Sequence, residues 1–365
     1  MKKVLPLLPL CFFLSCSKSL ITDNERQISE PLVIAYYAGD EESIDQFDLT
    51  GVDQIIFSFM HLKGNRLAID DAADSLTLLN LIAQKEKYPG LKVLVSLGGW
   101  GGCETCSNVF ATEAGREEFA QSSAEIIEFY EADGIDLDWE YPGISGYPGH
   151  PYQPEDKANF TDVVVRLRNH LKEDAVLSFA AGASSRFIEH SVEWDKVMPL
   201  VDHVNLMTYD FYGAGSDSTG HHTALGTDDF GGRSAFRTIE ELIQKGVRLD
   251  QMVLGAAFYI KTFKNVPNVN QGLYQPAEWN SSYNQVNFEE VAQDFEFYWD
   301  DSAAAPYAYD SINQIFATFD DHQSVRLKST YVRDNGLKGI MFWQLMNDKK
   351  SDGLLSEMVQ SIKGK

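Results

Sequence analysis

The segment at residues 133–140, DGIDLDWE, interleaves carboxylates with apolar side chains. Three acidic residues alternate with Ile, Leu and Trp, and these acids are Asp136, Asp138 and Glu140. Successive side chains of a β-strand point to opposite faces, so the three acids share one face and lie about 6.6 Å apart along it. A solvated strand face is the ordinary explanation of such alternation. The apolar residues opposite, however, indicate a strand packed beneath helices, and Tyr141-Pro142-Gly143 ends it directly after the acids.

Eight short apolar runs recur along the chain and alternate with longer amphipathic segments. The runs begin near residues 33, 54, 92, 134, 175, 203, 252 and 339. Helices are predicted over residues 113–132 and 155–173, where apolar residues recur at helical spacings. Eight repeats of strand and helix predict a closed (β/α)8 barrel. Active sites of such barrels lie at the carboxyl ends of the strands, where the three acids are expected.

One interval interrupts this alternation. About sixty residues rich in Tyr, Trp, Asn and Pro separate Tyr259 from His322. A connection of that length without secondary structure is uncommon in a compact domain. We therefore predict a small α+β insertion at residues 262–319, standing on the active face of a barrel domain that covers residues 31–365.

The first thirty residues predict export. Lys2 and Lys3 precede the apolar run VLPLLPLCFFLS, which is too short and too interrupted by proline to span a membrane but fits a signal peptide. The run ends in Ser15-Cys16, which resembles a bacterial lipoprotein signal. We expect removal of residues 1–15, lipidation of Cys16 and a polar tether over residues 16–30. An ordinary secretory signal is the alternative, and either one places the mature protein in the cell envelope or outside the cell.

Cys103 and Cys106 are the two cysteines beyond this N-terminal region. A CxxC pair can be half of a zinc site, a redox pair or a short disulfide. No second CxxC and no histidines at ligand spacing accompany it, so we predict a disulfide formed in an oxidising compartment. His221-His222 is expected to be a loop pair. The sequence therefore predicts neither a metal site nor a cofactor.

The charge balance narrows the choice of partners. The chain has 54 acidic and 30 basic residues, a net charge of -24. Nucleic acids and anionic membrane surfaces would be repelled, so membrane attachment is expected only through the lipid anchor. Aromatic residues make up 12% of the chain, which suits stacking on a neutral sugar. We expect the protein to be a monomer.

Four separated motifs resemble those of the family 18 glycoside hydrolases, in particular the chitinases. DGIDLDWE fits the DxxDxDxE signature of that family, and SLGGW at residues 96–100 fits its third-strand SxGG motif. MTYDFYG from residue 207 fits the sixth strand, and Trp343 in MFWQ fits the aromatic residue of the eighth. The resemblance covers residues 33–360 and implies a (β/α)8 fold and chitin oligosaccharides as substrates.

The resemblance also implies roles for individual residues. Glu140 would be the general acid, and the nucleophile would be the acetamido oxygen of the substrate, which closes an oxazolinium ring. Asp138 would hold the acetamido N–H, Asp136 would lie one step deeper, and Tyr209 would donate a hydrogen bond to the acetamido carbonyl. Crowding of the carboxylates is predicted to retain a shared proton and so to keep Glu140 protonated.

Further substrate contacts are expected from side chains near the strand ends. These are Asp210, Trp343, Tyr141, Trp100, Met207 and Tyr36. Trp139 is expected to pack away from the acids, and Asp133 to brace the turn into the strand. Many members have a glycine–arginine pair where this chain has Ile260-Lys261, which leaves the contacts beyond the cleaved bond in doubt.

Three functions are compatible with this pattern. The first is a retaining chitinase that cleaves β-1,4-linked N-acetylglucosamine. The second is an endo-β-N-acetylglucosaminidase that releases N-glycans on the same fold, although the DWEYP sequence and the insertion favour the chitinase. The third is a catalytically inactive chitin-binding lectin, which is disfavoured because such lectins typically lack the acid that Glu140 provides.

Overall fold

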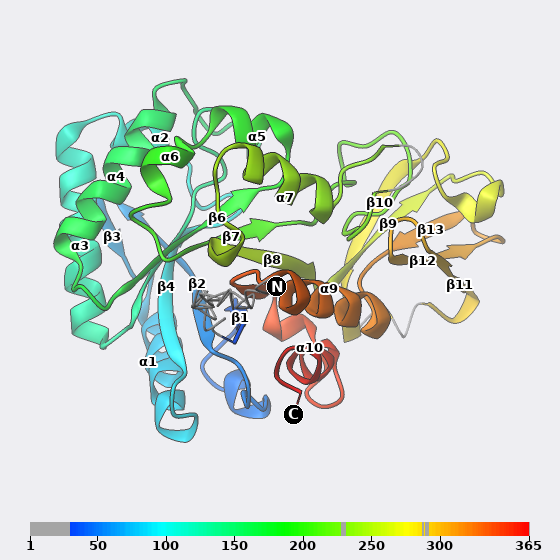
Figure 1. Ribbon diagram of the computed structural model, residues 1–365, viewed down its shortest axis with the longest axis horizontal. Coiled ribbons are helices and arrows are strands. Elements are labelled where there is room, and N and C mark those ends of the chain that lie inside the picture. The colour runs from blue at the N-terminus through cyan, green and yellow to red at the C-terminus, as the bar shows by residue number, and fades with distance from the viewer. Residues whose placement is uncertain (1–29, 228–230, 287, 289–291, 365) are drawn as a thin grey trace, which may run out of the picture.

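The computed structural model describes residues 30–227, 231–286, 288 and 292–364, and its larger part is a closed parallel barrel (Figure 1). The eight barrel strands are β1 (Leu32–Tyr37), β2 (Gln54–Lys63), β4 (Lys92–Gly98), β5 (Gly134–Asp138), β6 (Val176–Gly182), β7 (His203–Met207), β8 (Met252–Ala257) and β14 (Gly339–Trp343). Strand β1 pairs in parallel with both β14 and β2, which closes the ring. The predicted (β/α)8 fold is confirmed.

Helices surround the barrel. They are α1 (Ala72–Lys87), α2 (Cys106–Phe110), α3 (Glu113–Tyr130), α4 (Asp156–His170), α5 (Ser185–His190), α6 (Trp194–Val197), α7 (Ala235–Gln244), α9 (His322–Asn335) and α10 (Leu354–Lys363). Helix α3 ends where Glu131 adopts a left-handed backbone conformation with φ of 58°. The predicted helices over residues 113–132 and 155–173 therefore exist. The first ends two residues earlier than predicted, and the second begins one residue later and ends three residues earlier, where helices commonly fray.

Two apolar layers lie on opposite sides of the barrel wall. The larger layer fills the space between strands and helices and includes Ile135, Leu137 and Trp139. A smaller one fills the barrel interior and includes Tyr36 and Met341. Because β5 alternates, its apolar side chains enter the outer layer while its acids turn inward, as the sequence predicts.

The insertion is a second sheet, visible at the right of Figure 1. Its five antiparallel strands follow the order β10-β9-β13-β12-β11. They are β9 (Tyr259–Lys264), β10 (Glu278–Asn284), β11 (Glu296–Asp300), β12 (Ala305–Asp310) and β13 (Ile315–Thr318). A single residue, Phe258, separates β9 from β8, so no turn marks the transition in sequence. The sheet accordingly begins three residues before the predicted boundary at residue 262.

A short strand, β3 (Arg66–Ala68), forms a hairpin with the end of β2.

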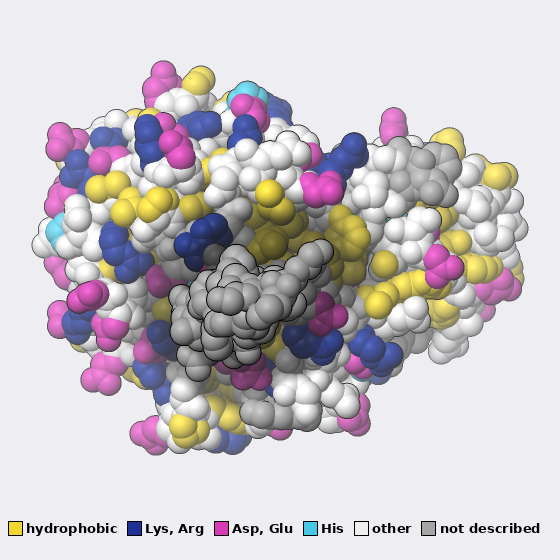
Figure 2. All heavy atoms as spheres, in the orientation of Figure 1, with side chains coloured by type: hydrophobic (Ala, Val, Ile, Leu, Met, Phe, Trp, Pro, Cys, Tyr) yellow, Lys and Arg dark blue, Asp and Glu magenta, His cyan; other side chains and the backbone are white. Residues whose placement is uncertain are grey.

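On the face drawn in Figure 2, charged side chains of both signs lie mainly over the barrel, and the insertion presents mostly uncharged and hydrophobic ones. Within the described ranges, no helix combines the length and the apolar character needed to cross a membrane. The predicted signal peptide and Cys16 lie outside the described residues.

Candidate active site

Asp136 is the centre of a polar layer inside the barrel. Its carboxylate accepts hydrogen bonds from Tyr36 Oη (2.9 Å) and Ser178 Oγ (2.6 Å). Asn205 Nδ2 (3.0 Å) and Ser96 Oγ (3.3 Å) donate to it as well. The donors come from β1, β4, β6 and β7, so four strands fix this one fully buried side chain. Tyr36 therefore helps to hold Asp136 in place.

Asp138 lies one inward position above Asp136. Its side chain is buried, and Oδ1 has no hydrogen-bond partner among the described residues. On the neighbouring strand β4, Gly98 lies opposite Asp138 and has no side chain that could donate a hydrogen bond. A larger residue would not fit there, because an added Cβ would lie 2.3 Å from the Asp138 carbonyl oxygen. A buried polar atom without a partner is costly and rare in native proteins. Asp138 Oδ1 is thus an acceptor available to a ligand that donates a hydrogen bond.

Glu140 follows directly after β5 and is 9% exposed. Burial raises the pKa of its carboxyl from 4.5 to about 7, although a hydrogen bond with Tyr141 opposes the shift, and the charge of Asp210 raises it further. A carboxyl group with such a pKa keeps its proton in slightly acidic solution and in about half of the molecules at pH 7. It can therefore donate that proton to a leaving group, as a general acid must.

The other two carboxyl groups respond to burial in the same direction. Burial raises the pKa of Asp138 well above its usual range, and the charges of Glu140 and Asp136 raise it further. Burial also raises the pKa of Asp136, against its hydrogen bonds to Ser178 and Tyr36. The sequence predicted that crowding of like charges would protonate Glu140. The structure instead gives burial as the largest cause for all three groups, with charge repulsion second for Asp138.

A cavity of about 660 Å³ opens above these acids at the carboxyl ends of the strands. This volume is typical of a ligand-binding pocket. The predicted residues that line it are Tyr36, Trp100, Asp138, Glu140, Tyr141, Met207, Tyr209, Asp210 and Trp343. At its base, the Trp343 ring stacks on Phe59 at 5.5 Å with an interplanar angle of 14° and lies 5.9 Å from Tyr36. Every predicted site residue of the barrel therefore lies in the cavity, except Asp136, which supports it.

Tyr209 places a hydroxyl group in the cavity. This hydroxyl lies 3.9 Å from the sulfur of Met341, a weak acceptor, so its proton remains available to a ligand. Burial raises the pKa of Tyr209 well above its usual range, and the charge of Asp138 adds to the effect. Tyr209 is therefore a neutral hydrogen-bond donor.

Asp210 is the negative member of a polar cluster on the cavity wall. Its Oδ1 lies 2.5 Å from both Tyr259 Oη and Lys261 Nζ and 3.7 Å from His222 Nδ1. Burial favours the neutral form, but His222 and Lys261 together hold the pKa of the Asp210 carboxyl below its ordinary value. Asp210 therefore stays ionised while Glu140 stays protonated.

Several cavity residues were not predicted from the sequence. Phe59 comes from β2, Tyr259 and Lys261 from β9, and Trp279 from β10 of the insertion. The Lys261 ammonium group lies 5.9 Å from the Trp279 ring centre. The sequence pointed to this wall only through the Ile260-Lys261 pair, which stands where many family members have glycine and arginine. In the structure, Lys261 supplies a cation to this wall of the cavity.

The remaining predicted residues lie outside the cavity. Trp139 packs against Phe110 at 5.3 Å in the outer layer. Asp133 accepts a hydrogen bond from Val93 N (2.8 Å) and so braces the turn into β5.

The histidine pair was expected to lie in a loop, and His221 lies 3.0 Å from Asp300. Throughout the described ranges, no three His, Cys, Asp or Glu side chains converge as a metal site would require.

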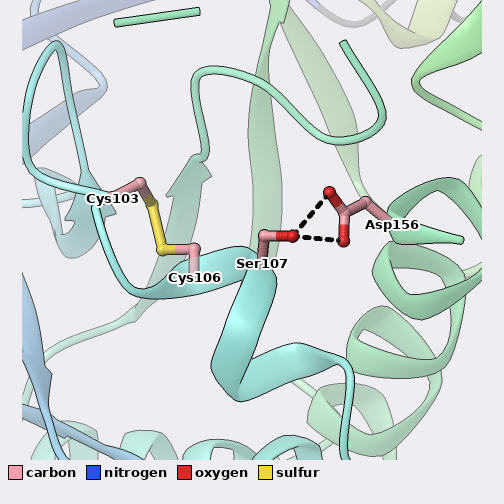
Figure 3. The surroundings of a disulfide bond; sticks show 4 residues. All are labelled: Cys103, Cys106, Ser107 and Asp156. Carbon is pink, nitrogen blue, oxygen red and sulfur yellow. Dashed lines mark hydrogen bonds between the residues drawn. A yellow bond between two sulfur atoms is a disulfide. The ribbon is translucent and has the colours of Figure 1, made fainter. Parts of the chain in front are cut away.

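Cys103 and Cys106 are joined by a disulfide at the start of α2 (Figure 3). Both cysteines are buried. The bridge closes a loop that follows β4, the strand beside β5. It therefore lies next to the strand that carries the acids.

A general acid above two further buried carboxyl groups, in an aromatic-lined cavity of a (β/α)8 barrel, is the arrangement of barrel glycoside hydrolases. The family model described as "Glycosyl hydrolases family 18" matches residues 32–348. The chain belongs to this family.

Named relatives agree with the family assignment. Chitinase A1 of Niallia circulans is 32% identical over 304 residues, which cover 76% of this chain and 43% of that protein. Chitotriosidase-1 of Mus musculus is 28% identical over 312 residues, which cover 80% of this chain and 66% of that protein. The chain thus spans less than two thirds of the length of either relative.

Solved structures agree in fold. A family 18 N-acetylglucosaminidase from Paenibacillus barengoltzii superposes with a TM-score of 0.81 at 33% identity, covering 91% of this chain and 99% of that one. Chitinase ChiW from Paenibacillus sp. str. FPU-7 gives a TM-score of 0.85 at 30% identity, covering 92% of this chain and 43% of that one.

Proposed function

We propose that the protein is a retaining chitinase that cleaves β-1,4-linked N-acetylglucosamine chains with assistance from the substrate itself. The observation that carries this proposal is the pair formed by Glu140 and Asp138. The pKa of Glu140 is raised to about 7, and Asp138 offers a buried oxygen that has no hydrogen-bond partner in the described part of the chain. A chain of acetamido sugars supplies a partner for each group. Its glycosidic oxygen can take the proton of Glu140, and its acetamido N–H can donate to Asp138.

The first chemical step breaks the glycosidic bond. Glu140 gives its proton to the leaving oxygen while the acetamido carbonyl oxygen bonds to the anomeric carbon, forming an oxazolinium ring. Asp138 accepts the acetamido N–H hydrogen bond and offsets the positive charge of that ring. Tyr209 donates its O–H to the acetamido oxygen and so orients it for attack.

The second step regenerates the acid. Water attacks the anomeric carbon from the opposite face and opens the ring, and the Glu140 carboxylate takes the proton from that water. Two inversions retain the β configuration. Trp343 supports the sugar ring at the cavity base, where its stacking on Phe59 fixes its plane. The fixed donors and acceptors surround the positions where charge develops.

The aromatic side chains of the cavity support a carbohydrate as the ligand. Trp100, Trp279 and Trp343 all face it. Named relatives include chitinases from bacteria and animals. One solved relative is named as an N-acetylglucosaminidase, so the size of the released product must be measured as well.

Product analysis tests this proposal against the alternatives. The protein is incubated with N-acetylglucosamine oligomers and with a high-mannose glycoprotein, and the released sugars are identified. We expect the oligomers to be cleaved, and proton NMR of the first-formed products should show the β-anomer. Release of N-glycans alone would indicate the endo-β-N-acetylglucosaminidase, binding without cleavage would indicate the lectin, and an initial α-anomer would refute assistance by the acetamido group.

Glu140→Gln is the matched variant for this experiment. The amide keeps the shape of the side chain but has no proton to give. Because general acid catalysis contributes about 10²- to 10⁴-fold, hydrolysis should fall by at least ~100-fold while oligomers still bind. Retention of a tenth of the wild-type rate would exclude Glu140 as the acid.

We also propose that the protein is a bacterial envelope lipoprotein anchored through Cys16, and a monomer. The support is the N-terminal sequence, in which a short apolar run ends in Ser15-Cys16. The full-length protein should partition into detergent with membranes, and Cys16→Ala should release it or stop its processing. Equal recovery of both forms in the soluble fraction would overturn the anchor, and size-exclusion chromatography with light scattering tests the monomer.

A further inference from the structure

An aromatic pair lies at the rim of the cavity. Trp100 lines the cavity and is 58% exposed, and Tyr147, from the loop that follows Glu140, is 38% exposed. Their ring centres are 5.5 Å apart with an interplanar angle of 66°, an edge-to-face contact. Tyr147 is itself backed by His150, with ring centres 4.7 Å apart. More than half of the Trp100 side chain therefore stays open although Tyr147 supports it.

Trp100 needs such support because of its backbone. Two glycines precede it and two follow it in the sequence GGWGG at residues 98–102. Three of them, Gly98, Gly99 and Gly101, adopt positive φ angles, which other residues rarely do. A Cβ added at Gly101 would lie 3.2 Å from the Tyr147 ring. The glycines let the loop pass close to Tyr147, but they leave the Trp100 position to be set by tertiary contacts.

The Cys103–Cys106 disulfide lies directly after this glycine segment. A Cβ added at Gly98 would lie 3.0 Å from Cys103 Sγ, so the bridge packs against the loop near its beginning. The bridge also closes the segment of residues 103–106, which runs from the end of the glycines to the first residue of helix α2. Such a short covalent loop restricts the backbone on the C-terminal side of Trp100.

The residue after the bridge, Ser107, is hydrogen-bonded to Asp156 (Figure 3). Ser107 Oγ donates to Asp156, with 2.9 Å to each carboxylate oxygen. Asp156 Oδ2 also accepts hydrogen bonds from Gln153 N (2.9 Å) and Gly143 N (3.4 Å), near the two ends of the Tyr147 loop. Asp156 is fully buried. One carboxylate therefore joins both ends of that loop to the start of α2.

We propose that Tyr147 is a positioning residue, which holds Trp100 in place so that Trp100 binds a sugar ring at the rim of the cavity and favours longer chains. The Cys103–Cys106 disulfide and the Ser107–Asp156 contact position the two loops and preorganise the pair. Preorganisation raises affinity because less conformational entropy is lost on binding. This inference rests on the proposed function, because it takes N-acetylglucosamine chains as the ligand.

Binding in the Glu140→Gln background tests the inference without hydrolysis. Oligomers of two to six N-acetylglucosamine units are titrated calorimetrically into this protein and into its Tyr147→Ala derivative. An aromatic contact of this kind accounts for about 2- to 12-fold in affinity, so Tyr147→Ala should weaken hexamer binding by that factor and dimer binding less. Tyr147→Phe should retain the preference, because the ring remains.

Two further comparisons separate the aromatic pair from its supports. Tyr152→Ala is the matched control, because Tyr152 is a 48% exposed tyrosine on the same loop without a ring contact to Trp100. It should leave binding unchanged. Cys103→Ala/Cys106→Ala and Ser107→Ala should both reduce the hexamer preference, and the second keeps the disulfide in case the first does not fold.

The outcomes distinguish this inference from the proposed function. If no oligomer binds in the Glu140→Gln background, the proposed function and this inference both fail. If oligomers bind and Tyr147→Ala leaves the hexamer-to-dimer affinity ratio unchanged, only the role of Tyr147 is refuted. If Ser107→Ala folds and keeps that ratio, the positioning role of the Ser107–Asp156 contact is refuted.

Discussion

Replacing Glu140 by glutamine should stabilise the protein at neutral and alkaline pH while it removes activity. The carboxyl is nearly buried, and burial is the largest cause of its raised pKa. The folded protein must therefore hold a buried negative charge once the pH exceeds that pKa. An amide at the same position carries no charge at any pH, so the variant avoids this penalty.

The magnitude follows from the shift in pKa. The pKa rises from 4.5 to about 7, a difference of about 2.5 units, and each unit corresponds to about 1.4 kcal/mol. The folded state binds this proton more tightly than the unfolded state, so the free energy of unfolding falls as pH rises. The loss begins near pH 4.5 and is complete above pH 7. Between pH 4 and pH 8 the variant should gain about 3 kcal/mol relative to the wild type.

Urea denaturation of both proteins at pH 4 and pH 8 measures this difference, provided that the slopes of the transitions agree. Glu118→Gln, which removes an exposed carboxylate on α3, is the control and should show no such dependence. The wild-type hydrolysis rate should fall by about tenfold per pH unit above pH 7, as the acid loses its proton. A stability difference that is equal at both pH values would refute burial as the cause of the raised pKa.

Three further predictions concern groups around the acid. Tyr209→Phe removes the hydroxyl that orients the acetamido oxygen for attack and should lower kcat by about 10²-fold with folding intact, and steady-state kinetics with circular dichroism test this. Lys261→Met removes the cation 2.5 Å from Asp210, so the pKa of Asp210 should rise, which NMR titration of the carboxyl group measures. An unchanged pKa of Asp210 would contradict this. Lys328→Met leaves the buried Asp320 carboxylate, 2.6 Å from Lys328 Nζ, without its cation and should lower the free energy of unfolding by about 3 to 5 kcal/mol in urea denaturation. A loss below ~1 kcal/mol would show that the fold does not depend on this ion pair.

The barrel and its ladder of acids could be predicted because both depend on short-range patterns. Alternation of period two in residues 134–140 directs the apolar side chains outward and the acids inward, and the strand stops directly after them. Eight apolar runs separated by amphipathic segments favour one architecture, because parallel strands need helical crossovers. Spacing along one strand also fixed Asp136 below Asp138 before any neighbouring strand was known.

Contacts between distant segments could not be predicted in this way. Asp136 receives its hydrogen bonds from side chains on β1, β4, β6 and β7, and their register is decided only when the barrel closes. Lys261 and Trp279 reach the cavity because the insertion folds back over the barrel, and nothing in their local sequence encodes that path.

The cause of the raised pKa of Glu140 was likewise decided by tertiary structure. The sequence shows how many carboxylates share a strand, which suggests repulsion between them. Burial depends on what packs around the side chain, including Tyr141 and the cavity wall contributed by several strands. Periodicity along one segment therefore determined the fold and the order of the acids, whereas packing between segments far apart in sequence determined their proton affinity and their partners.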